Sequence, residues 1–510
     1  MKNKIIYTLL TLFCIACKKE ALYLESDVAI PLAYTDLSIQ NIVPDSLYTI
    51  ENGNIILSYQ DTIKALDLKD FVVVPDTSIS DTIKFSSNFP LSFAPGSSIA
   101  NIVRRVKMPL GDAKLKLIEI KSGNLSNTIT NFLNQPIRIN YNFNNGRDIA
   151  NNVLALQQVI PANTLVEKII NVTDTKFDLT DGALNFNLIN TSMSAQVDNT
   201  ATGSINLTPQ QNMVKAKIQF KNVVPKYAEG YFGKRTIEKE SDVNIDVFKM
   251  VQSGQIDFES INLEMNVLNS IGVDATIEIL ELKAVNTINN TSFNLIHSAV
   301  GGSTNINRGY KQNNTARASS TKILFNNTNS NITNFISQLP NKLHYKVKII
   351  TNPLGNISHY TDFVYNTSSL DIGIKLRIPL KFKTQNLTLI DTIPVNDALK
   401  TDNIYLSGNL NLIAKNNIPQ QFRVQIIGLD IAKNSIKTIL PNTFIEAGTL
   451  NNIQKSIISI PLNTDELESF KKIKYLVVQT ILNTPSNTFF DWNSLYKINL
   501  RFTYTGIVGR

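Results

Sequence analysis

The chain has 510 residues, 43% hydrophobic and 18% charged, with two Cys, three His and one Trp. This length suits about three domains of ~150 residues, and the low charge content argues against a disordered or coiled-coil chain. Two cysteines exclude a disulfide scaffold, a Cys-based zinc site and an iron–sulfur cluster, and a net charge of +8 spread along the chain argues against nucleic acid as a partner.

The first 17 residues have the pattern of a secretory signal. Lys2 and Lys4 form a positive start, an apolar run follows over residues 5–16, and small Ala16 precedes Cys17. The apolar run is shorter than the ~20 residues that a membrane-spanning helix needs. We therefore expect residues 1–16 to be removed on export.

The residues around Cys17 allow a finer interpretation. Phe13-Cys14-Ile15-Ala16-Cys17 resembles the lipobox of bacterial lipoproteins, although Cys14 stands where that family usually has Leu. The resemblance implies that Cys17 becomes the mature N-terminus and carries covalent lipid (palmitate among its acyl chains), which anchors the protein to a membrane. The alternative is an ordinary signal peptide that is cleaved nearby, with Cys17 a bystander.

The residues after Cys17 bear on the membrane involved. Lys18, rather than Asp, implies transport to the outer membrane, and Lys18-Lys19-Glu20 is similar to the surface-export tag of Bacteroidota lipoproteins. The predicted location is therefore the outer membrane, on the cell surface or the periplasmic face, with residues 17–28 as a tether.

Period-2 alternation dominates the rest of the chain and predicts an all-β fold of tandem immunoglobulin-like β-sandwich domains. Residues 261–267 and 273–279 alternate on either side of Asn269-Ser270-Ile271-Gly272 and predict a hairpin. The 62 Asn residues predict many turns between short strands. Further alternating runs are at residues 137–143, 343–349, 374–382, 422–426 and 498–504.

Three segments predict short helices, each followed by a strand. They lie at residues 128–136, 331–340 and 464–470, and each has a polar N-cap candidate and a Phe on an apolar face. The first two share Ile-Thr-Asn-Phe, which suggests duplication; chance recurrence in an Ile/Asn/Thr-rich chain is the alternative.

Polar stretches set the expected domain boundaries near residues 28, 210 and 320. The predicted division is a β-sandwich at 29–210, a second at 211–320 and one or more at 321–510.

The sequence carries no catalytic or metal-binding motif, so we predict no enzymatic activity and no cofactor beyond the lipid. His297, His344 and His359 lack zinc-site spacing, and a nucleophile elbow and a phosphate-binding Gly-rich loop are also missing. A pair of distant carboxylates for glycoside hydrolysis stays open, because such residues come from separate strands.

Two aromatic segments are candidate binding sites. Residues 226–235 combine Gly with aromatic and basic side chains, here Tyr227, Tyr231, Phe232 and Arg235, and Trp492 is a second candidate platform. The competing interpretation is that these aromatic side chains pack beneath a tight turn.

As a whole the chain resembles large uncharacterised lipoproteins of Bacteroidota, through its start, its Ile30–Leu37 segment, the Tyr-Phe-Gly loop and the Asn-rich β pattern. The expected function is a non-enzymatic binding or assembly component of the cell envelope, whose partner is another envelope protein. The alternative is a surface accessory that binds glycans for nutrient capture.

Overall fold

The computed structural model describes residues 25–38, 43–71, 78–182, 185–248, 251–396, 404–485 and 488–509. Strands dominate these ranges, and α3 (Ile332–Ser337) and α4 (Thr464–Lys471) are the two α-helices found in them. The predicted all-β class is confirmed. None of the helices in the described ranges has both the length and the apolarity to cross a bilayer.

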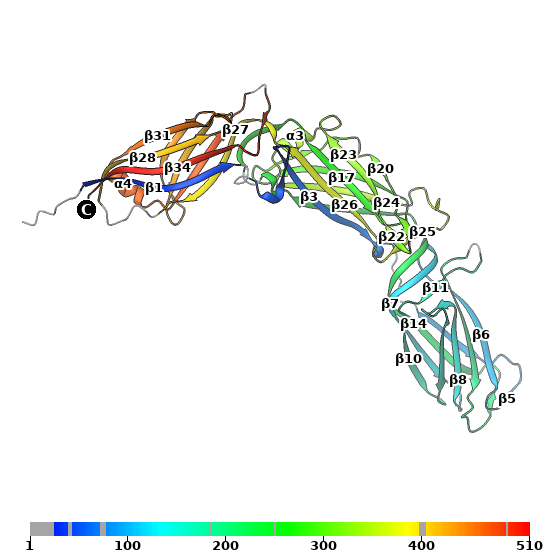
Figure 1. The fold of residues 1–510 in the computed structure, drawn as a ribbon. Coiled ribbons are helices and arrows are strands. Elements are labelled where there is room, and N and C mark those ends of the chain that lie inside the picture. Colours follow the sequence, from blue (N-terminus) through cyan, green and yellow to red (C-terminus); the bar gives the residue numbers. More distant parts are fainter. Residues whose placement is uncertain are drawn as a thin grey trace, which may run out of the picture.

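The strands form three bodies arranged as a bent rod (Figure 1). The chain starts in the body at one end and runs through the middle body to the distal body. It then returns to the middle body, adds residues 251–258 to the first body, enters the middle body again over residues 262–379, and finishes in the first body. The distal body is thus a single insertion in the middle body, and the middle body is inserted at two places in the first body, here called the terminal body.

The terminal body holds both ends of the described chain. One sheet pairs β1 (Glu25–Ser38), β34 (Lys497–Gly509), β28 (Ile404–Asn416) and β31 (Gln454–Leu462) in this order. The other has the order β16 (Val251–Phe258), β27 (Lys381–Pro394), β32 (Tyr475–Leu482), β29 (Phe422–Leu429) and β30 (Ser435–Ile445), with β33 (Phe490–Asp491) on β27.

The middle body has two five-stranded sheets. The first has the order β2 (Tyr48–Glu51), β3 (Asn54–Asp67), β26 (Ser369–Pro379), β17 (Asn262–Asn269) and β23 (Ser319–Asn326). The second consists of β15 (Arg235–Asn244), β24 (Lys342–Thr351), β18 (Ala275–Asn286), β19 (Thr291–Asn294) and β20 (Ser303–Ile306). A small hairpin, β21 (Tyr310–Gln312) and β22 (Thr315–Arg317), extends from this body.

The distal body is built around two long neighbouring strands, β7 (Lys114–Asn131) and β14 (Asn212–Tyr231). On this side β4 (Ser78–Lys84) pairs with β14, and β10 (Leu165–Asn171) pairs with β7. The other side has the order β9 (Val153–Ile160), β8 (Ile137–Arg147), β12 (Leu188–Val197) and β6 (Ser98–Lys107). The short strands are β11 (Lys176–Asp178), which joins β7 to β8, and the pair β5 (Leu91–Phe93) and β13 (Ile205–Leu207).

These pairings correct the expected domain boundaries. β14 begins just after residue 210 yet pairs with β7, and β24 lies beyond residue 320 yet pairs with β15 and β18. Residue 28 lies inside β1, so the expected tether overlaps the first strand. Alternation reveals that a segment is a strand but says nothing of its partner, and here the partners are far apart in sequence.

The predicted hairpin at residues 261–279 is also wrong. β17 belongs to one sheet of the middle body and β18 to the other, so Asn269–Gly272 carries the chain across the sandwich. Ile271 is buried in this crossing, and Gly272 lies against the ring of Phe363, where a Cβ would collide.

Two of the three predicted helices are confirmed. α3 buries Phe335, and α4 buries Phe470 behind a capping box formed by Asn463 and Glu466. Residues 128–131 instead finish β7, and Phe132 is exposed. The pairing of β7 with both β10 and β14 overrides the local helix signal there.

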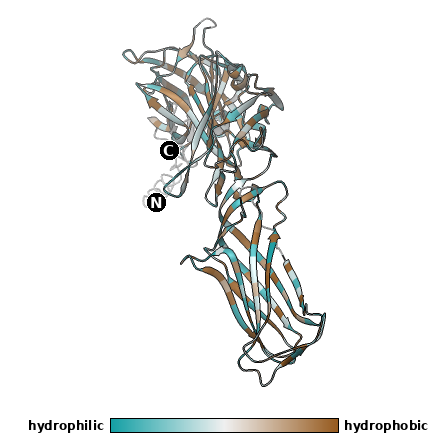
Figure 2. Ribbon diagram, turned by 90° about the vertical axis from the view of Figure 1, so that its right-hand side faces the viewer, coloured by the Kyte–Doolittle hydropathy of each residue, from teal (hydrophilic) through white to brown (hydrophobic). Residues whose placement is uncertain are grey.

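Apolar side chains alternate inward along the strands and form the core. Figure 2 shows this alternation along the strands of the distal body. In β12, for example, buried and half-buried residues alternate over its full length. In the described ranges, ten of the 16 non-Gly residues with positive φ are Asn, which agrees with the prediction that Asn marks turns.

Asn also has a second use, as the buried last residue of a strand. Asn131, Asn269, Asn286 and Asn416 end β7, β17, β18 and β28, and all four are buried. In each, Oδ1 accepts a hydrogen bond from the N–H two residues ahead while Nδ2 donates to loop carbonyls. The amide satisfies backbone groups that the strand ladder leaves open where the chain turns away.

We expect Asn416→Ala to lower the free energy of unfolding by about 1–3 kcal/mol, because it leaves buried backbone groups without partners. Asn416 Nδ2 donates to Gln420 O at 3.1 Å and Glu446 O at 2.8 Å, and its Oδ1 accepts from Ile418 N at 2.8 Å. Denaturant unfolding measures the effect. Asn409→Ala on the same strand, at an exposed position, is the control and should change stability by less than about 0.5 kcal/mol. Equal effects would contradict the assignment.

Candidate functional site

The lipid-attachment candidate, Cys17, lies outside the described residues, as does the whole predicted signal segment. The first described residue is Glu25, and it pairs with Gly509 at the end of the terminal body.

The aromatic segment at residues 226–235 lies where the distal body meets the middle body (Figure 1). It is the end of β14 and the beginning of β15, and β14 pairs here with β25 (Asp362–Tyr365) as well as β7. Tyr227 and Phe232 are buried, and Tyr231 and Arg235 are half-buried. The segment is therefore a junction between bodies, and its aromatic side chains pack inside it.

A charged cluster closes this junction. Lys311, on the β21–β22 hairpin of the middle body, lies 2.6 Å from Glu229 Oε2 and donates to the Tyr227 hydroxyl. Tyr227 in turn donates to Glu229, and Lys116 of β7 lies 3.7 Å from the same carboxylate. The Lys311 ammonium is also 4.9 Å from the Tyr227 ring centroid and 4.8 Å from that of Phe363.

The pKa shifts in the cluster indicate a structural role. Burial, reinforced by the Glu229 carboxylate, raises the pKa of Tyr227 well above its usual value, so this phenol stays protonated and is no base. Burial alone would raise the pKa of Glu229, but hydrogen bonds from Lys311 and Tyr227 outweigh it and leave the pKa below its usual value. The cluster holds the two bodies together by charge-assisted hydrogen bonds.

The other residues of the segment brace the same junction. Phe232 packs edge-to-face on Phe71 with ring centroids 5.9 Å apart, and Arg235 Nη1 donates to Asp70 O at 3.1 Å. Gly230 has φ of 150°, and a Cβ there would collide with the Lys114 carbonyl oxygen. The glycine is needed because β7 and β14 approach closely at this point.

Trp492, the second predicted platform, is a core residue with 4% exposure. Its ring stacks on Phe382 with centroids 6.3 Å apart and meets Phe490 edge-on. It is therefore not available for stacking against a ligand in this structure.

We expect the junction to weaken at low pH, because the Glu229 carboxylate becomes protonated there. Its folded-state pKa lies below its usual value, so it stabilises the folded state above about pH 4.5 and loses this effect as the pH falls through the folded-state pKa. Glu229→Gln should destabilise the protein by about 1–2 kcal/mol at pH 7, with the difference from wild type shrinking below pH 4.5. Unfolding measured at pH 7, 5 and 3.5 tests this.

Lys311→Met is the partner variant, because it removes the cation that lowers the Glu229 pKa. It should reduce the same pH dependence. A Lys311→Met protein whose stability followed pH as wild type does would contradict the cluster's role.

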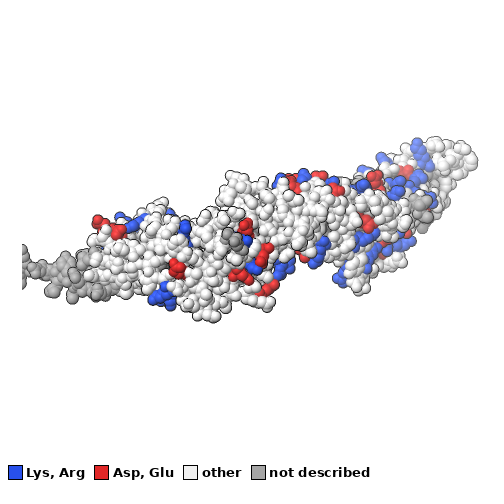
Figure 3. Space-filling model, turned by 90° about the horizontal axis from the view of Figure 1, so that it is seen from above, with Lys and Arg blue, Asp and Glu red and all other residues white. Residues whose placement is uncertain are grey.

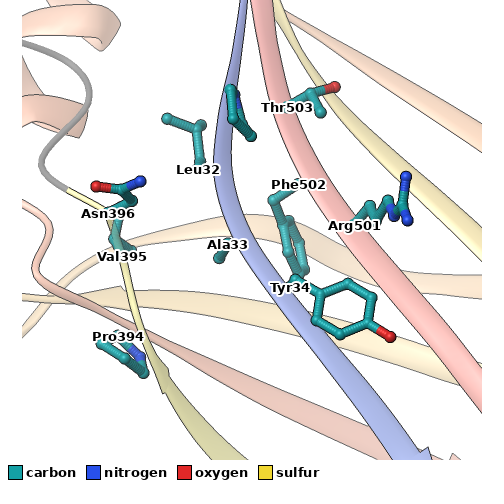
Figure 4. A pocket seen from close by; sticks show the side chains of 10 residues that line it. Leu32, Ala33, Tyr34, Pro394, Val395, Asn396, Arg501, Phe502 and Thr503 are labelled. Atoms are coloured by element: carbon teal, nitrogen blue, oxygen red, sulfur yellow. The ribbon is translucent and has the colours of Figure 1, made fainter.

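A hollow lies in the terminal body beside the first strand. It has a volume of about 650 Å³ and is lined by three segments: residues 31–34 of β1, residues 394–396 at the end of β27, and residues 501–503 of β34. Figure 4 shows Pro394, Val395 and Asn396 facing Leu32 and Ala33 across this hollow. Asn396 N donates to Leu32 O at 2.7 Å, which ties its two sides together.

An aromatic–cation pair stands at its rim. Tyr34 is 53% exposed, and the Arg501 guanidinium lies 5.7 Å from its ring centroid. The Tyr34 hydroxyl donates to Asp36 Oδ2 at 2.7 Å, and Asn499 Nδ2 donates to both residues at 2.8 Å. Hydrogen bonding to Asp36 is the main cause that raises the pKa of Tyr34. This network orients an exposed ring beside a cavity, an arrangement suited to binding.

Sequence reasoning did not single out Tyr34 or Arg501 as a site. Arg501 lies on a predicted strand, but the strand that carries Tyr34 was not predicted, and the approach of the two residues depends on β1 pairing with β34, across almost the whole chain. An exposed Tyr in an alternating strand is ordinary by itself, so the sequence holds no signal for the pair.

The titratable side chains offer no metal centre in the described ranges, where no three His, Cys, Asp or Glu groups converge suitably. His344 lies in a ladder of ion pairs on the β15–β24–β18 sheet, with Nδ1 2.9 Å from Asp242 Oδ1. His297 packs on Phe325, and burial lowers its pKa. Figure 3 shows acidic and basic side chains side by side over the middle body.

Comparison with known proteins assigns the chain to no family. No known family and no curated protein matches the chain. A Parabacteroides distasonis protein described as secreted shares 11% identity over 56% of this chain and 92% of its own, with a TM-score of 0.30. A structure of Sulfolobus turreted icosahedral virus shares 12% identity over 88% of this chain and 95% of its own, with a TM-score of 0.12. Scores this low carry no argument about fold or function.

Proposed function

We propose that this protein is an outer-membrane lipoprotein that carries no catalytic centre and uses its rod to hold a binding body away from the membrane. The observation that supports this is the pairing of β1 with β34, which brings the start of the described chain to the free end of the terminal body. A tether on the N-terminal side then leaves the distal body as the most remote part (Figure 1).

The length of the tether limits how far the terminal body can lie from the membrane. Seven residues separate Cys17 from Glu25, and at about 3.5 Å per residue they reach at most roughly 28 Å. A lipid on Cys17 would therefore keep the terminal body close to the bilayer. β14 alone, with 20 residues at about 3.3 Å each, extends roughly 65 Å through the distal body and the junction. The distal body thus lies far from the anchored end, where a partner in the envelope or outside the cell can bind it.

Four exposed hydroxyl residues agree with export. Ser46, Thr62, Thr82 and Thr392 each follow an Asp and precede an apolar residue, as in the O-glycan acceptor of exported Bacteroidota proteins, and all four are exposed.

Replacement of the proposed lipid-attachment residue tests the anchor. Cys17→Ser should abolish incorporation of labelled palmitate and release the protein from the membrane fraction, because the proposal assigns the membrane anchor to the lipid on Cys17. Cys14→Ser is the matched control, since Cys14 would leave with the signal segment, and it should be labelled like wild type. Retention of label and membrane association by Cys17→Ser would refute the lipoprotein proposal.

Glycan binding is the second candidate function, supported by Tyr34 beside the cavity of the terminal body. An exposed aromatic ring with a neighbouring Arg and Asn can stack on a sugar and bond its hydroxyls. Tyr34→Ala should then lower the affinity for envelope or host polysaccharides at least tenfold in a pull-down, while Trp492→Phe should leave it unchanged. Equal binding by wild type and Tyr34→Ala would eliminate this site.

A further inference from the structure

The distal body has an open side, where its two layers end in strands with unused edges. In the described part of the chain, β4 pairs only with β14 and β6 only with β12. A cleft of about 180 Å³ enters the sandwich between β4 and β6. Most of its lining is apolar, and Ser80 is among the polar residues that also line it; the apolar residues are Ile79, Ile102, Val106, Met193, Ala216 and Ile218.

The cleft has a polar group at depth. Tyr141 of β8 lines it with 6% exposure and hydrogen-bonds to Thr191 of β12, which is 2% exposed. Protein interiors rarely leave space larger than a water molecule, and this cleft has room for about six waters at ~30 Å³ each. A slot with apolar walls and a few polar groups is the usual form of a small-molecule site.

The mouth of the cleft carries a charged pair. Arg104 Nε donates to Asp81 Oδ2 at 2.7 Å across the gap, and the two side chains are 53% and 30% exposed. Both side chains stand on the inward rows of their strands, between apolar wall residues. An exposed ion pair of this kind is weak and exchanges readily.

Arg104 can engage a ligand without losing that pair. The bond to Asp81 uses Nε, and among the described residues neither Nη group has a protein partner. Two Nη donors match the two oxygens of a carboxylate. Residues 78–231 hold 15 Lys and Arg against 10 Asp and Glu, so the distal body has a net charge of +5, out of +8 for the chain. Lys and Arg spread over its visible face in Figure 3, and this field favours an anion.

We propose that this cleft binds a carboxylate attached to a short apolar group, with the carboxylate on Arg104 and the apolar group between β4 and β6. Two sources share this chemistry: a free short-chain fatty acid, and the C-terminus of a peptide that ends in an apolar residue. The inference deepens the proposed function by giving the distal body a ligand, but it does not depend on the anchor.

The test uses the soluble chain from residue 18 onward, so it is separate from the Cys17→Ser experiment. Calorimetric titration with butanoate, pentanoate and hexanoate should give dissociation constants that tighten about fourfold per methylene, the equivalent of ~0.8 kcal/mol per buried CH₂. Acetyl-Gly-Leu as free acid and as amide forms the second arm. Whichever carboxylate binds more tightly identifies the source, and the amide should bind at least tenfold more weakly than the acid.

Two variants and one matched control locate the site. Arg104→Met should lower the affinity for hexanoate at least tenfold and leave the affinity for hexanol unchanged. Ala216→Leu should fill the cleft and abolish the binding of both compounds. Arg105→Met is the control, because Arg105 is the next residue on β6 but pairs with Asp181, 3.0 Å away, and does not line the cleft.

Circular dichroism and thermal unfolding establish that each variant folds. The proposal is overturned if the folded wild type binds no carboxylate at millimolar concentration. It is equally overturned if Arg105→Met lowers the affinity for hexanoate as much as Arg104→Met does, because the basic surface as a whole, and not the cleft, would then attract the carboxylate.

Discussion

The ladder between β1 and β34 is the constraint on which the arrangement of the molecule depends. Thirteen residue pairs join the first described strand to the last, from Glu25 with Gly509 to Ser38 with Lys497. With both ends fixed in one body, everything between must leave that body and return. The middle and distal bodies are therefore insertions, and the rod has one end that holds both termini and one that is far from them.

Nested insertion places particular demands on the junctions. The chain crosses the junction between the distal and middle bodies twice and that between the middle and terminal bodies four times, so side chains from distant segments must meet there. The Tyr227–Glu229–Lys311 cluster meets this demand between the distal and middle bodies, with backbone pairing of β14 and β25 beside it. Such a junction resists bending because buried aromatic packing and charge-assisted hydrogen bonds act together.

The candidate binding features lie away from the junctions, at the two ends of the rod. The terminal body offers a cavity with an exposed aromatic ring, and the distal body offers a narrow apolar cleft with a guanidinium at its mouth. Aromatic residues that looked suited to recognition, Phe232 and Trp492, are instead buried supports. Of the 41 aromatic residues of the chain, 21 are buried in the described ranges.

The sequence by itself determined the all-β class, the positions of several strands, two short helices and the use of Asn at turns. Those features depend on local patterns: side-chain alternation with period 2, capping residues, and the tolerance of Asn for positive φ. Local patterns also suggested a helix at residues 128–136 and a hairpin at 261–279, and tertiary pairing overruled both. Strand partners, the order of the bodies, the Tyr34–Arg501 pair and the cleft between β4 and β6 were decided only by the tertiary structure. The physical reason is that alternation gives every strand a buried face without naming its neighbour, so contacts between residues hundreds of positions apart follow from how whole sheets pack.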